Sequence, residues 1–205
     1  MPPIATESRL IGGRGRLGSR VQELLNERGR TAGQIGEIAG IPALKMAAIV
    51  DGAHDLRLPV LADLAAALEV RASHLALAYA LPSDALLPTP PSRPSTRRFD
   101  AREAAGRLGR AIRLARLLRG MGRSETAAAT QMDVCEIRRI ETGRAASPRL
   151  ADVHALAVAL CDRQEEATSL LGALIALYAD DEHARRRVAA LVPELAGADP
   201  QVRSA

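Results

Sequence analysis

The sequence predicts an all-α protein. Hydrophobic residues make up 47% of the 205 residues but aromatic residues only 1%, so we expect a core built from Ala, Leu, Ile and Val. The chain is rich in Ala, Leu and Arg, which favour helices, and it lacks clusters of the β-branched and aromatic residues that favour strands. Its length and hydrophobic content suffice for one or two small domains, each with a real core.

The stretch from Gly122 to Gly143 predicts two short helices joined by a tight turn. Asp133 stands where the N-cap of the second helix is expected, with Glu136 three residues later, which is the pattern of a capping box. Ile137 and Ile140 share one face of this helix and can join a core. The polar residues on its other faces are Glu136, Arg138 and Arg139. Such a helix can sit on a scaffold and enter the major groove of DNA.

The order of these residues resembles the helix-turn-helix of the Cro and phage-repressor type, the XRE family. The resemblance implies a lambda-repressor-like fold and DNA binding. Gln131 stands where the family has a turn glycine, which costs about 1 kcal/mol if this residue must adopt a positive φ. Gly122 and Thr126 also depart from the pattern, at a usual Thr and a usual Leu. The matching residues are Ala127, Ile137, Ile140, Glu141, Gly143, Pro148, Leu156 and Leu160.

An internal repeat becomes visible when the chain is compared with itself at a shift of 91 residues. At this shift Gly18 coincides with Gly109, and Gly52 coincides with Gly143. Beyond these glycines one inserted residue changes the shift, and the Leu-rich helices that follow coincide again. The sequence therefore predicts two tandem copies of one five-helix domain.

The predicted organisation has five parts. Prolines among Ser and Thr in residues 81–98 indicate an extended, semi-stiff linker. Residues 1–16 lack periodicity and predict a flexible arm. Asp162 is expected to cap a further helix, and the apolar stretches 170–178 and 182–191 fit either a dimerisation element or a cover for the domain's own core. The parts are the N-terminal arm (1–16), a first, divergent helix-turn-helix domain (17–80), the Pro-rich linker (81–98), a second helix-turn-helix domain (99–161) and extra C-terminal helices (162–205).

The resemblance also implies an ion pair within the second copy. In this family an arginine of the first helix usually pairs with the glutamate of the Ile-Glu-x-Gly run, and the matching residues are Arg116 and Glu141. In the first copy both positions are apolar, as Leu25 and Val50. Loss of one partner would strand a buried charge at a cost of about 3–5 kcal/mol, whereas replacement of both can be neutral. The first copy is therefore expected to fold without the pair.

The first copy keeps its turn but changes the surface that would read DNA. Thr31 and Gln34 match a capping box, and Gly40 supplies the turn glycine. The second helix of that copy, Pro42 to Val50, offers Lys45 as its one cation, so its hydrogen-bonding capacity toward base edges is small. Two roles stay open for this apolar face: contact with thymine methyl groups and contact with a protein partner.

Positive charge is concentrated on the segment that carries the motif. The net charge of the chain is +4, but residues 97–149 hold 13 arginines against 6 acidic residues. Residues 14–79 are nearly balanced, with 8 basic and 7 acidic residues, and residues 150–205 hold 5 basic and 9 acidic residues. This distribution is the electrostatic footprint expected of a protein that binds the phosphate backbone.

The sequence gives no indication of an enzyme, a metal site or a cofactor. The four histidines lie in separate segments, and no Gly-rich phosphate loop or nucleophile motif is visible. Cys135 and Cys161 are expected to be reduced thiols. No apolar run reaches the roughly 20 residues of a membrane span, and no signal peptide is visible, so we expect a cytoplasmic, nucleoid-associated protein.

These observations predict a sequence-specific transcriptional regulator of double-stranded DNA, a repressor and homodimer that reads mainly through the second copy. Arg139 is expected to contact a guanine, and Arg123 and Arg144 are expected to contact the phosphate backbone. A small-molecule effector is left open. The alternatives are an antitoxin-like or sporulation-associated assembly module with only nonspecific DNA affinity, and a covalent pseudo-dimer in which both copies read DNA. The predicted DNA-binding residues are Arg123, Val134, Cys135, Glu136, Arg138, Arg139, Arg144 and Lys45.

Overall fold

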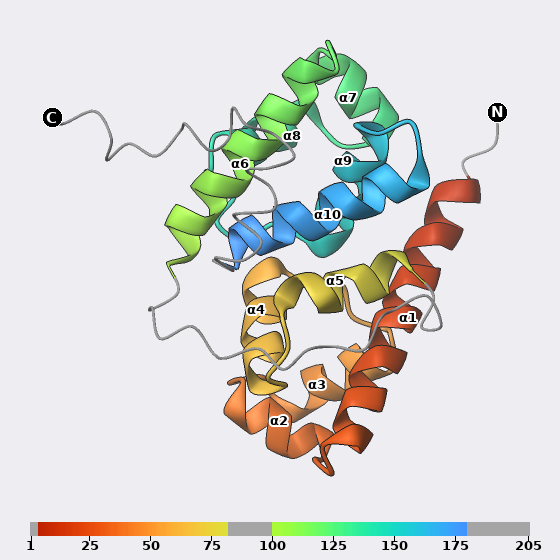
Figure 1. Cartoon of the computed structure of the whole chain (residues 1–205), viewed down its shortest axis with the longest axis vertical. Coiled ribbons are helices and arrows are strands. Elements are labelled where there is room, and N and C mark those ends of the chain that lie inside the picture. The colour runs from red at the N-terminus through yellow and green to blue at the C-terminus, as the bar shows by residue number, and fades with distance from the viewer. Residues whose placement is uncertain (1–3, 82–99, 180–205) are drawn as a thin grey trace, which may run out of the picture.

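The computed structural model describes residues 4–81 and 100–179, and for residues 4–11 the backbone alone. Over these residues every regular element is a helix (Figure 1), which confirms the prediction of an all-α fold for this part of the chain. The helices are α1 (Ile4–Glu27), α2 (Ala32–Ile38), α3 (Ala43–Val50), α4 (Leu58–Ala67), α5 (Ala72–Ala80), α6 (Ala101–Leu118), α7 (Arg123–Thr130), α8 (Val134–Glu141), α9 (Leu150–Ala159) and α10 (Gln164–Tyr178).

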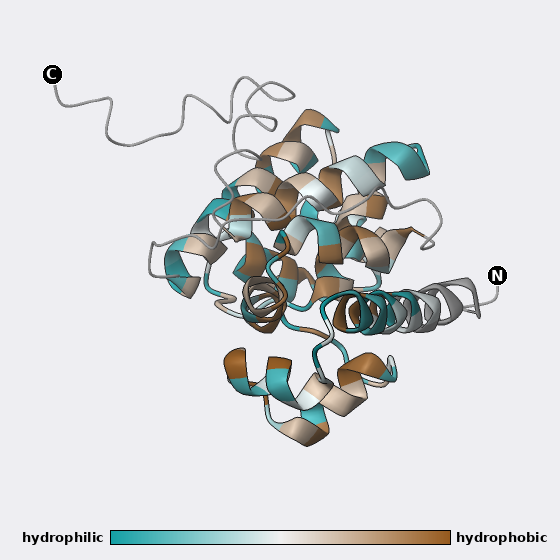
Figure 2. Ribbon diagram, turned by 60° about the horizontal axis from the view of Figure 1, so that its bottom comes forward, coloured by the Kyte–Doolittle hydropathy of each residue, from teal (hydrophilic) through white to brown (hydrophobic). Residues whose placement is uncertain are grey.

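The helices form two sets of five, the first set being α1–α5 and the second set α6–α10. Within each set the long first helix packs on the third, α1 on α3 and α6 on α8, and the fifth helix packs on the first. Figure 2 shows hydrophobic and hydrophilic residues interspersed along the helices of both sets. This is the pattern of amphipathic helices that bury one face against their neighbours.

Paired glycines set the closest approach of the helices in each set. A Cβ on Gly18 would meet the backbone carbonyl oxygens of the last residues of α3, and a Cβ on Gly109 would meet those of α8. After each of these helices a glycine with φ +69° turns the chain, Gly52 in the first set and Gly143 in the second. A Cβ on Gly52 would lie 2.8 Å from the Cα of Gly15, so the turn also presses directly on α1. The 91-residue repeat of the sequence thus corresponds to repeated backbone contacts.

The two sets meet at an antiparallel backbone bridge between Arg57 and Arg149, which precede α4 and α9. Its two hydrogen bonds run in opposite directions, from the N–H of Leu58 to the carbonyl of Pro148 at 2.9 Å and from the N–H of Leu150 to the carbonyl of Leu56 at 2.8 Å. Figure 1 shows α1 and α6 on opposite flanks of the molecule with α5 and α10 between them. The bridge is therefore symmetric about a local half-turn, which exchanges the residues before α4 with those before α9.

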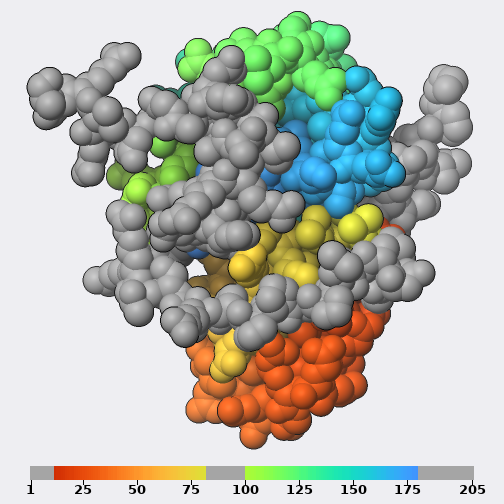
Figure 3. All heavy atoms as spheres, viewed as in Figure 1, coloured from red at the N-terminus to blue at the C-terminus, as the bar shows by residue number. Residues whose placement is uncertain are grey.

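Helix α10 packs against α5 of the first set as well as against α6 and α9. In Figure 3 the atoms of α10 lie directly against those of α5. The rings of Tyr79 and His154 also meet edge to face across the two sets, with centroids 5.4 Å apart. The buried residues of α10 include Leu171, Leu174, Ile175 and Tyr178. The apolar face expected to serve either dimerisation or the domain's own core is thus covered in part by the first set.

The prediction of a flexible arm over residues 1–16 is wrong for residues 4–16, which belong to α1. Gly13 is a contact position rather than a sign of flexibility, since a Cβ on it would lie 2.7 Å from the ring of Tyr79. Arg16 donates from Nη2 to the backbone carbonyl of Tyr79 at 2.8 Å, and Arg14 lies 3.6 Å from the carboxylate of Asp55. These partners lie more than 40 residues away in sequence, beyond the reach of a local pattern.

The caps of the helices agree with the sequence in part. Thr31 and Gln34 form the predicted capping box of α2. Asp133 caps α8 by accepting from the N–H of Cys135 at 2.6 Å, but the second bond of a capping box, from the Asp133 N–H to the Glu136 carboxylate, is not formed. Asp162 is not the cap of α10, which starts after Arg163. The Asp162 carboxylate instead accepts from Arg119 at 2.7 Å. Residues 82–98 of the linker predicted at 81–98, and the predicted helix at 182–191, lie outside the described residues.

Two glycines on one face of α6 are expected to respond oppositely to alanine. Gly109→Ala should destabilise the protein by about 1–3 kcal/mol, because its Cβ would collide with backbone carbonyls of α8 that cannot move aside. Gly106→Ala should stabilise it by about 0.5–1 kcal/mol, since its Cβ would come no closer than 3.6 Å to the mobile Nη1 of Arg110. Urea unfolding of both variants measures these changes. The same sign for both would contradict the close crossing of α6 and α8.

Candidate nucleic-acid interface

Helices α7 and α8 are joined by a turn whose geometry is that of a helix-turn-helix. Gln131 closes α7 in the left-handed region, with φ +57°, as expected for a residue that replaces the turn glycine. At the matching position of the first set Gly40 has φ +66°. Glutamine adopts this conformation at a cost of about 1 kcal/mol, so this turn is formed against a local preference and is held by the packing around it.

The interior of α7 explains why Thr126 can stand where a leucine is usual. Its side chain is fully buried, and its hydroxyl donates to the backbone carbonyl of Gly122 at 2.9 Å. One turn later Thr130 donates in the same way to the carbonyl of Thr126 at 2.8 Å. A buried hydroxyl costs little when a local carbonyl accepts its hydrogen bond, so both threonines are compatible with the core.

Helix α8 is divided into a buried face and an exposed face. Ile137 and Ile140 are 0% and 3% exposed and fix the helix on the core. The exposed residues are Val134, Cys135, Glu136, Arg138 and Arg139. All five are residues that the sequence assigned to DNA, so the structure gathers them on one short helix and leaves them open to a ligand.

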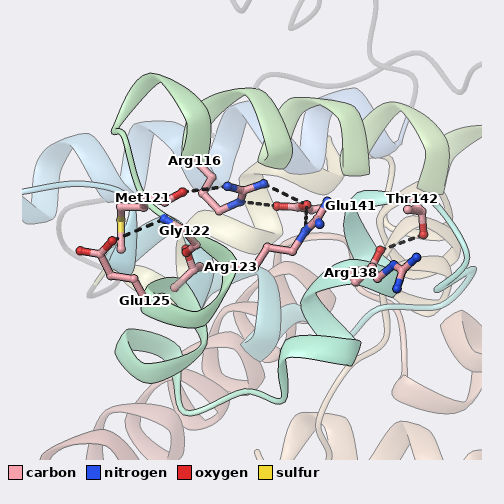
Figure 4. A network of polar contacts seen from close by, with 9 residues as sticks. Arg116, Met121, Gly122, Arg123, Glu125, Arg138, Glu141 and Thr142 are labelled. Atoms are coloured by element: carbon pink, nitrogen blue, oxygen red, sulfur yellow. Dashed lines mark hydrogen bonds and ion pairs between the residues drawn. The ribbon is translucent and has the colours of Figure 1, made fainter.

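The buried face of α8 ends in an ion cluster around Glu141 (Figure 4). Arg116 of α6 donates from Nε to Oε1 of Glu141 at 2.6 Å and from Nη2 to Oε2 at 3.2 Å. Its Nη1 donates to the backbone carbonyl of Met121 at 2.7 Å. Arg123, the first residue of α7, donates from Nε to Oε2 of Glu141 at 2.7 Å. One carboxylate therefore ties α6, α7 and α8 together.

Arg123 was expected on the phosphate backbone, but the structure places its Nε on Glu141. The signal for this contact was present in the repeat. At the shift of 91 residues the counterparts of Arg116, Arg123 and Glu141 are Leu25, Ala32 and Val50. All three members of the cluster are thus uncharged in the first set, and the change at Ala32 is the sequence signal for the contact of Arg123.

The charge of Glu141 is stabilised by its partners. Burial of the carboxyl disfavours ionisation, but the hydrogen bonds from Arg116 and Arg123 outweigh it and hold the pKa of Glu141 below its ordinary value. The side chain of Glu141 is 0% exposed and that of Arg116 7% exposed. Hydrogen bonds between charged groups are strong in such surroundings, so the cluster fixes the orientation of α8.

The remaining predicted site residues lie apart from the ion cluster. Arg144, just beyond α8, is exposed, and its N–H donates to the carbonyl of Arg139 at 2.9 Å. Lys45 lies on α3 in the first set and is half-buried. Its neighbour Leu44 is 88% exposed, and Ile38 at the end of α2 is 60% exposed. At the shift of 91 residues the counterparts of Arg138 and Arg139 are Ala47 and Ala48, so α3 is apolar where α8 carries arginines.

Comparison with known families agrees with this geometry. A family model described as a helix-turn-helix domain matches residues 107–171, from the middle of α6 to the middle of α10. The match supports a helix-turn-helix domain over this stretch of the chain and, through it, DNA binding. Neither the curated proteins nor the solved structures gave a match. Within the described residues, every helix is too short or too polar to cross a membrane.

Removal of one charge from the ion cluster is expected to be far more damaging than removal of all three. Glu141→Val should lower the free energy of unfolding by about 3–5 kcal/mol, because it leaves Arg116 buried without its carboxylate. The combination Arg116→Leu, Arg123→Ala and Glu141→Val reproduces the residues of the first set and should cost no more than about 1 kcal/mol. Thermal and urea unfolding compare the two. A triple variant less stable than the single one would refute the account of the cluster.

The cluster also predicts how stability depends on pH. Because the folded-state pKa of Glu141 is lowered, its contribution is fully present above the pKa of the unfolded chain and is lost as the pH falls through the folded-state value. The difference in unfolding free energy between the native protein and Glu141→Gln should therefore be largest at neutral pH and shrink below about pH 4. A difference that is constant between pH 7 and pH 3 would show that the charge of Glu141 is not what stabilises the fold.

Proposed function

We propose that the protein is a sequence-specific, double-stranded DNA-binding transcriptional regulator that reads the major groove through α8. The observation that carries this proposal is the division of α8 into two faces. Its buried face is fixed by two isoleucines and by the Glu141 carboxylate, and its exposed face carries Arg138 and Arg139. A reading helix needs both properties, because side chains can discriminate between bases only if their backbone is held in one orientation.

The exposed residues of α8 have the chemistry of base recognition. An arginine can donate two hydrogen bonds to O6 and N7 of guanine, and we assign this role to Arg139. Glu136 can accept from the amino group of cytosine, and Val134 can contact a thymine methyl group. Arg144 follows the helix and is assigned to a phosphate, which fixes the register of α8 along the groove without reading sequence.

The charge distribution supports a long-range attraction to DNA. The segment 97–149, with 13 arginines against 6 acidic residues, spans α6 to the start of α9 and includes the reading helix. Neutralisation of phosphates by the exposed arginines of this segment, which exclude Arg116, releases counterions and makes affinity fall with salt. A salt-dependent term of this kind steers the protein onto any DNA, while the contacts of α8 select the site.

We propose further that the first set is a divergent copy of the same domain and that the protein acts as a repressor. The repeated glycine contacts and the repeated helix order support the common origin. Repression requires only that a bound protein occupies a promoter. The homodimer expected from the sequence would need a surface other than the part of α10 that α5 covers. The family match favours DNA binding over a pure assembly module.

The proposal predicts different consequences for two exposed arginines. Arg139→Ala should reduce affinity for the preferred site by about 1–3 kcal/mol and relax the preference at one base pair. Arg144→Ala should weaken binding to preferred and random duplexes alike. It should also make the fall of the logarithm of the association constant with the logarithm of the salt concentration less steep, by about one unit of slope. Fluorescence anisotropy titrations on both duplexes at several salt concentrations measure these effects.

Arg163→Ala provides a control with the same change in charge, since Arg163 is exposed at the start of α10 and has no assigned DNA contact. It should leave the discrimination between preferred and random duplexes unchanged. The assignment of α8 as the reader is refuted if Arg139→Ala and Arg163→Ala lose discrimination equally or not at all.

A further inference from the structure

We infer that one chain of this protein spans two adjacent half-sites on DNA, which it treats unequally. The helix α8 reads one half-site, and α3 lies in the major groove of the other without reading it by hydrogen bonds. The inference rests on the proposed function of α8 and specifies the length, stoichiometry and asymmetry of the DNA site.

The first step is the symmetry of the contact between the two sets. At the shift of 92 residues that applies beyond the insertion, Arg57 corresponds to Arg149. The bridge between them is reciprocal, because each strand donates one hydrogen bond to the other, at 2.9 and 2.8 Å. Two copies related by a two-fold axis through the bridge would form this same pair of bonds. Such self-complementary contacts are those of isologous dimers, and here one polypeptide supplies both halves.

The second step is the placement of α3 relative to α8. We extend the half-turn of the bridge to the two sets, whose helices follow the same order. A half-turn keeps every point at its own height along the axis, so α3 and α8 would lie at the same height with their outer faces inclined equally to the axis. The outer face of α3 is therefore expected on the same side of the molecule as that of α8. Proteins of two-fold symmetry meet DNA in this way, with equivalent helices about one helical turn apart in successive major grooves.

The third step is the fixed relation between the two sets. Besides the bridge, Arg57 donates from Nη1 to the carbonyl of Ser147 at 2.9 Å. Helix α5 packs on α10, and the ring of Tyr79 meets that of His154. Contacts that join backbone, core helices and aromatic rings leave little freedom for relative rotation. When α8 enters its groove, α3 is carried to the DNA with it.

The fourth step is the chemistry of α3. Its outward positions are Ala43, Leu44, Lys45, Ala47 and Ala48, which offer methyl groups and one ammonium to base edges. Leu44 is 88% exposed, and short alanines beside it allow close approach to thymine methyl groups. The exposed carboxylates of Glu37 and Asp51 lie at the ends of α2 and α3, where their negative charge would repel the phosphates. The contact is therefore expected to be weak and tolerant of sequence.

Duplex length tests this inference directly. The full chain is titrated with a duplex of about 22 base pairs centred on the dyad and with one of about 11 base pairs that holds only the half-site read by α8. We expect one chain on each, binding to the longer duplex tighter by about tenfold, and two blocks of backbone protection about one helical turn apart. The sequence recovered by selection should be well defined in one block and weakly defined, with a bias to A·T pairs, in the other.

A variant of α3 separates its role from that of α8. Leu44→Glu should weaken binding to the longer duplex severalfold through repulsion of phosphates, and should leave the shorter duplex unaffected. Gln22→Glu makes the same change in charge at an exposed position of α1 and should alter neither.

Each outcome decides a separate claim. Equal affinity for the two duplexes, one protected block and no effect of Leu44→Glu would overturn the inference, and would leave the apolar face of α3 as a surface for a protein partner. Two chains on the longer duplex would overturn it as well, in favour of a homodimer. In both cases specific binding through α8 would stand. Loss of sequence preference on both duplexes would instead reject the proposed function itself.

Discussion

The orientation of α8 depends on one buried carboxylate. Glu141 ends the apolar face of that helix and receives hydrogen bonds from Arg116 of α6 and Arg123 of α7. A charge at this depth is costly unless it is fully paired, and the two arginines supply the pairing from both neighbouring helices. The first set dispenses with all three charges and still forms the corresponding helices. The cluster is therefore not required for this fold, and we interpret it as the device that holds a reading helix in place.

The two sets share a scaffold but differ on the outer surface of their third helices, which explains how one chain can give two similar domains different roles. Their scaffolds are held by the same glycine contacts beneath the third helix. Their outer surfaces differ, since α8 carries arginines and α3 carries Leu44 among alanines. The reciprocal bridge at Arg57 and Arg149 then joins the set with the arginine-bearing α8 to the set whose α3 is mostly apolar. A DNA site bound by such a molecule is expected to have two half-sites related by two-fold symmetry, of which only one has a defined sequence.

Local signals in the sequence predicted the helices and the buried face of α8 correctly. The cap at Asp133, the isoleucines three residues apart and the glycines after the helices act within a few residues of themselves, so a pattern reveals them. Long-range contacts were missed. A local pattern does not reveal that Arg123 pairs with Glu141, nor that Gly13 packs on Tyr79, because these partners lie far along the chain. The spacing of Asp162 predicts a cap, but its carboxylate pairs with Arg119 at the end of α6, a contact that no local pattern reveals.

The central claim is that α8 reads sequence, and selection from a random duplex pool at about 150 mM salt tests it most directly. The intact chain is compared with a variant in which Arg138 and Arg139 are both alanine, and Glu141 and its partners are kept. The account predicts that the intact chain recovers a defined sequence and that the variant, folded to the same stability, recovers none. Recovery of the same sequence by both proteins, or enrichment by neither, would contradict it.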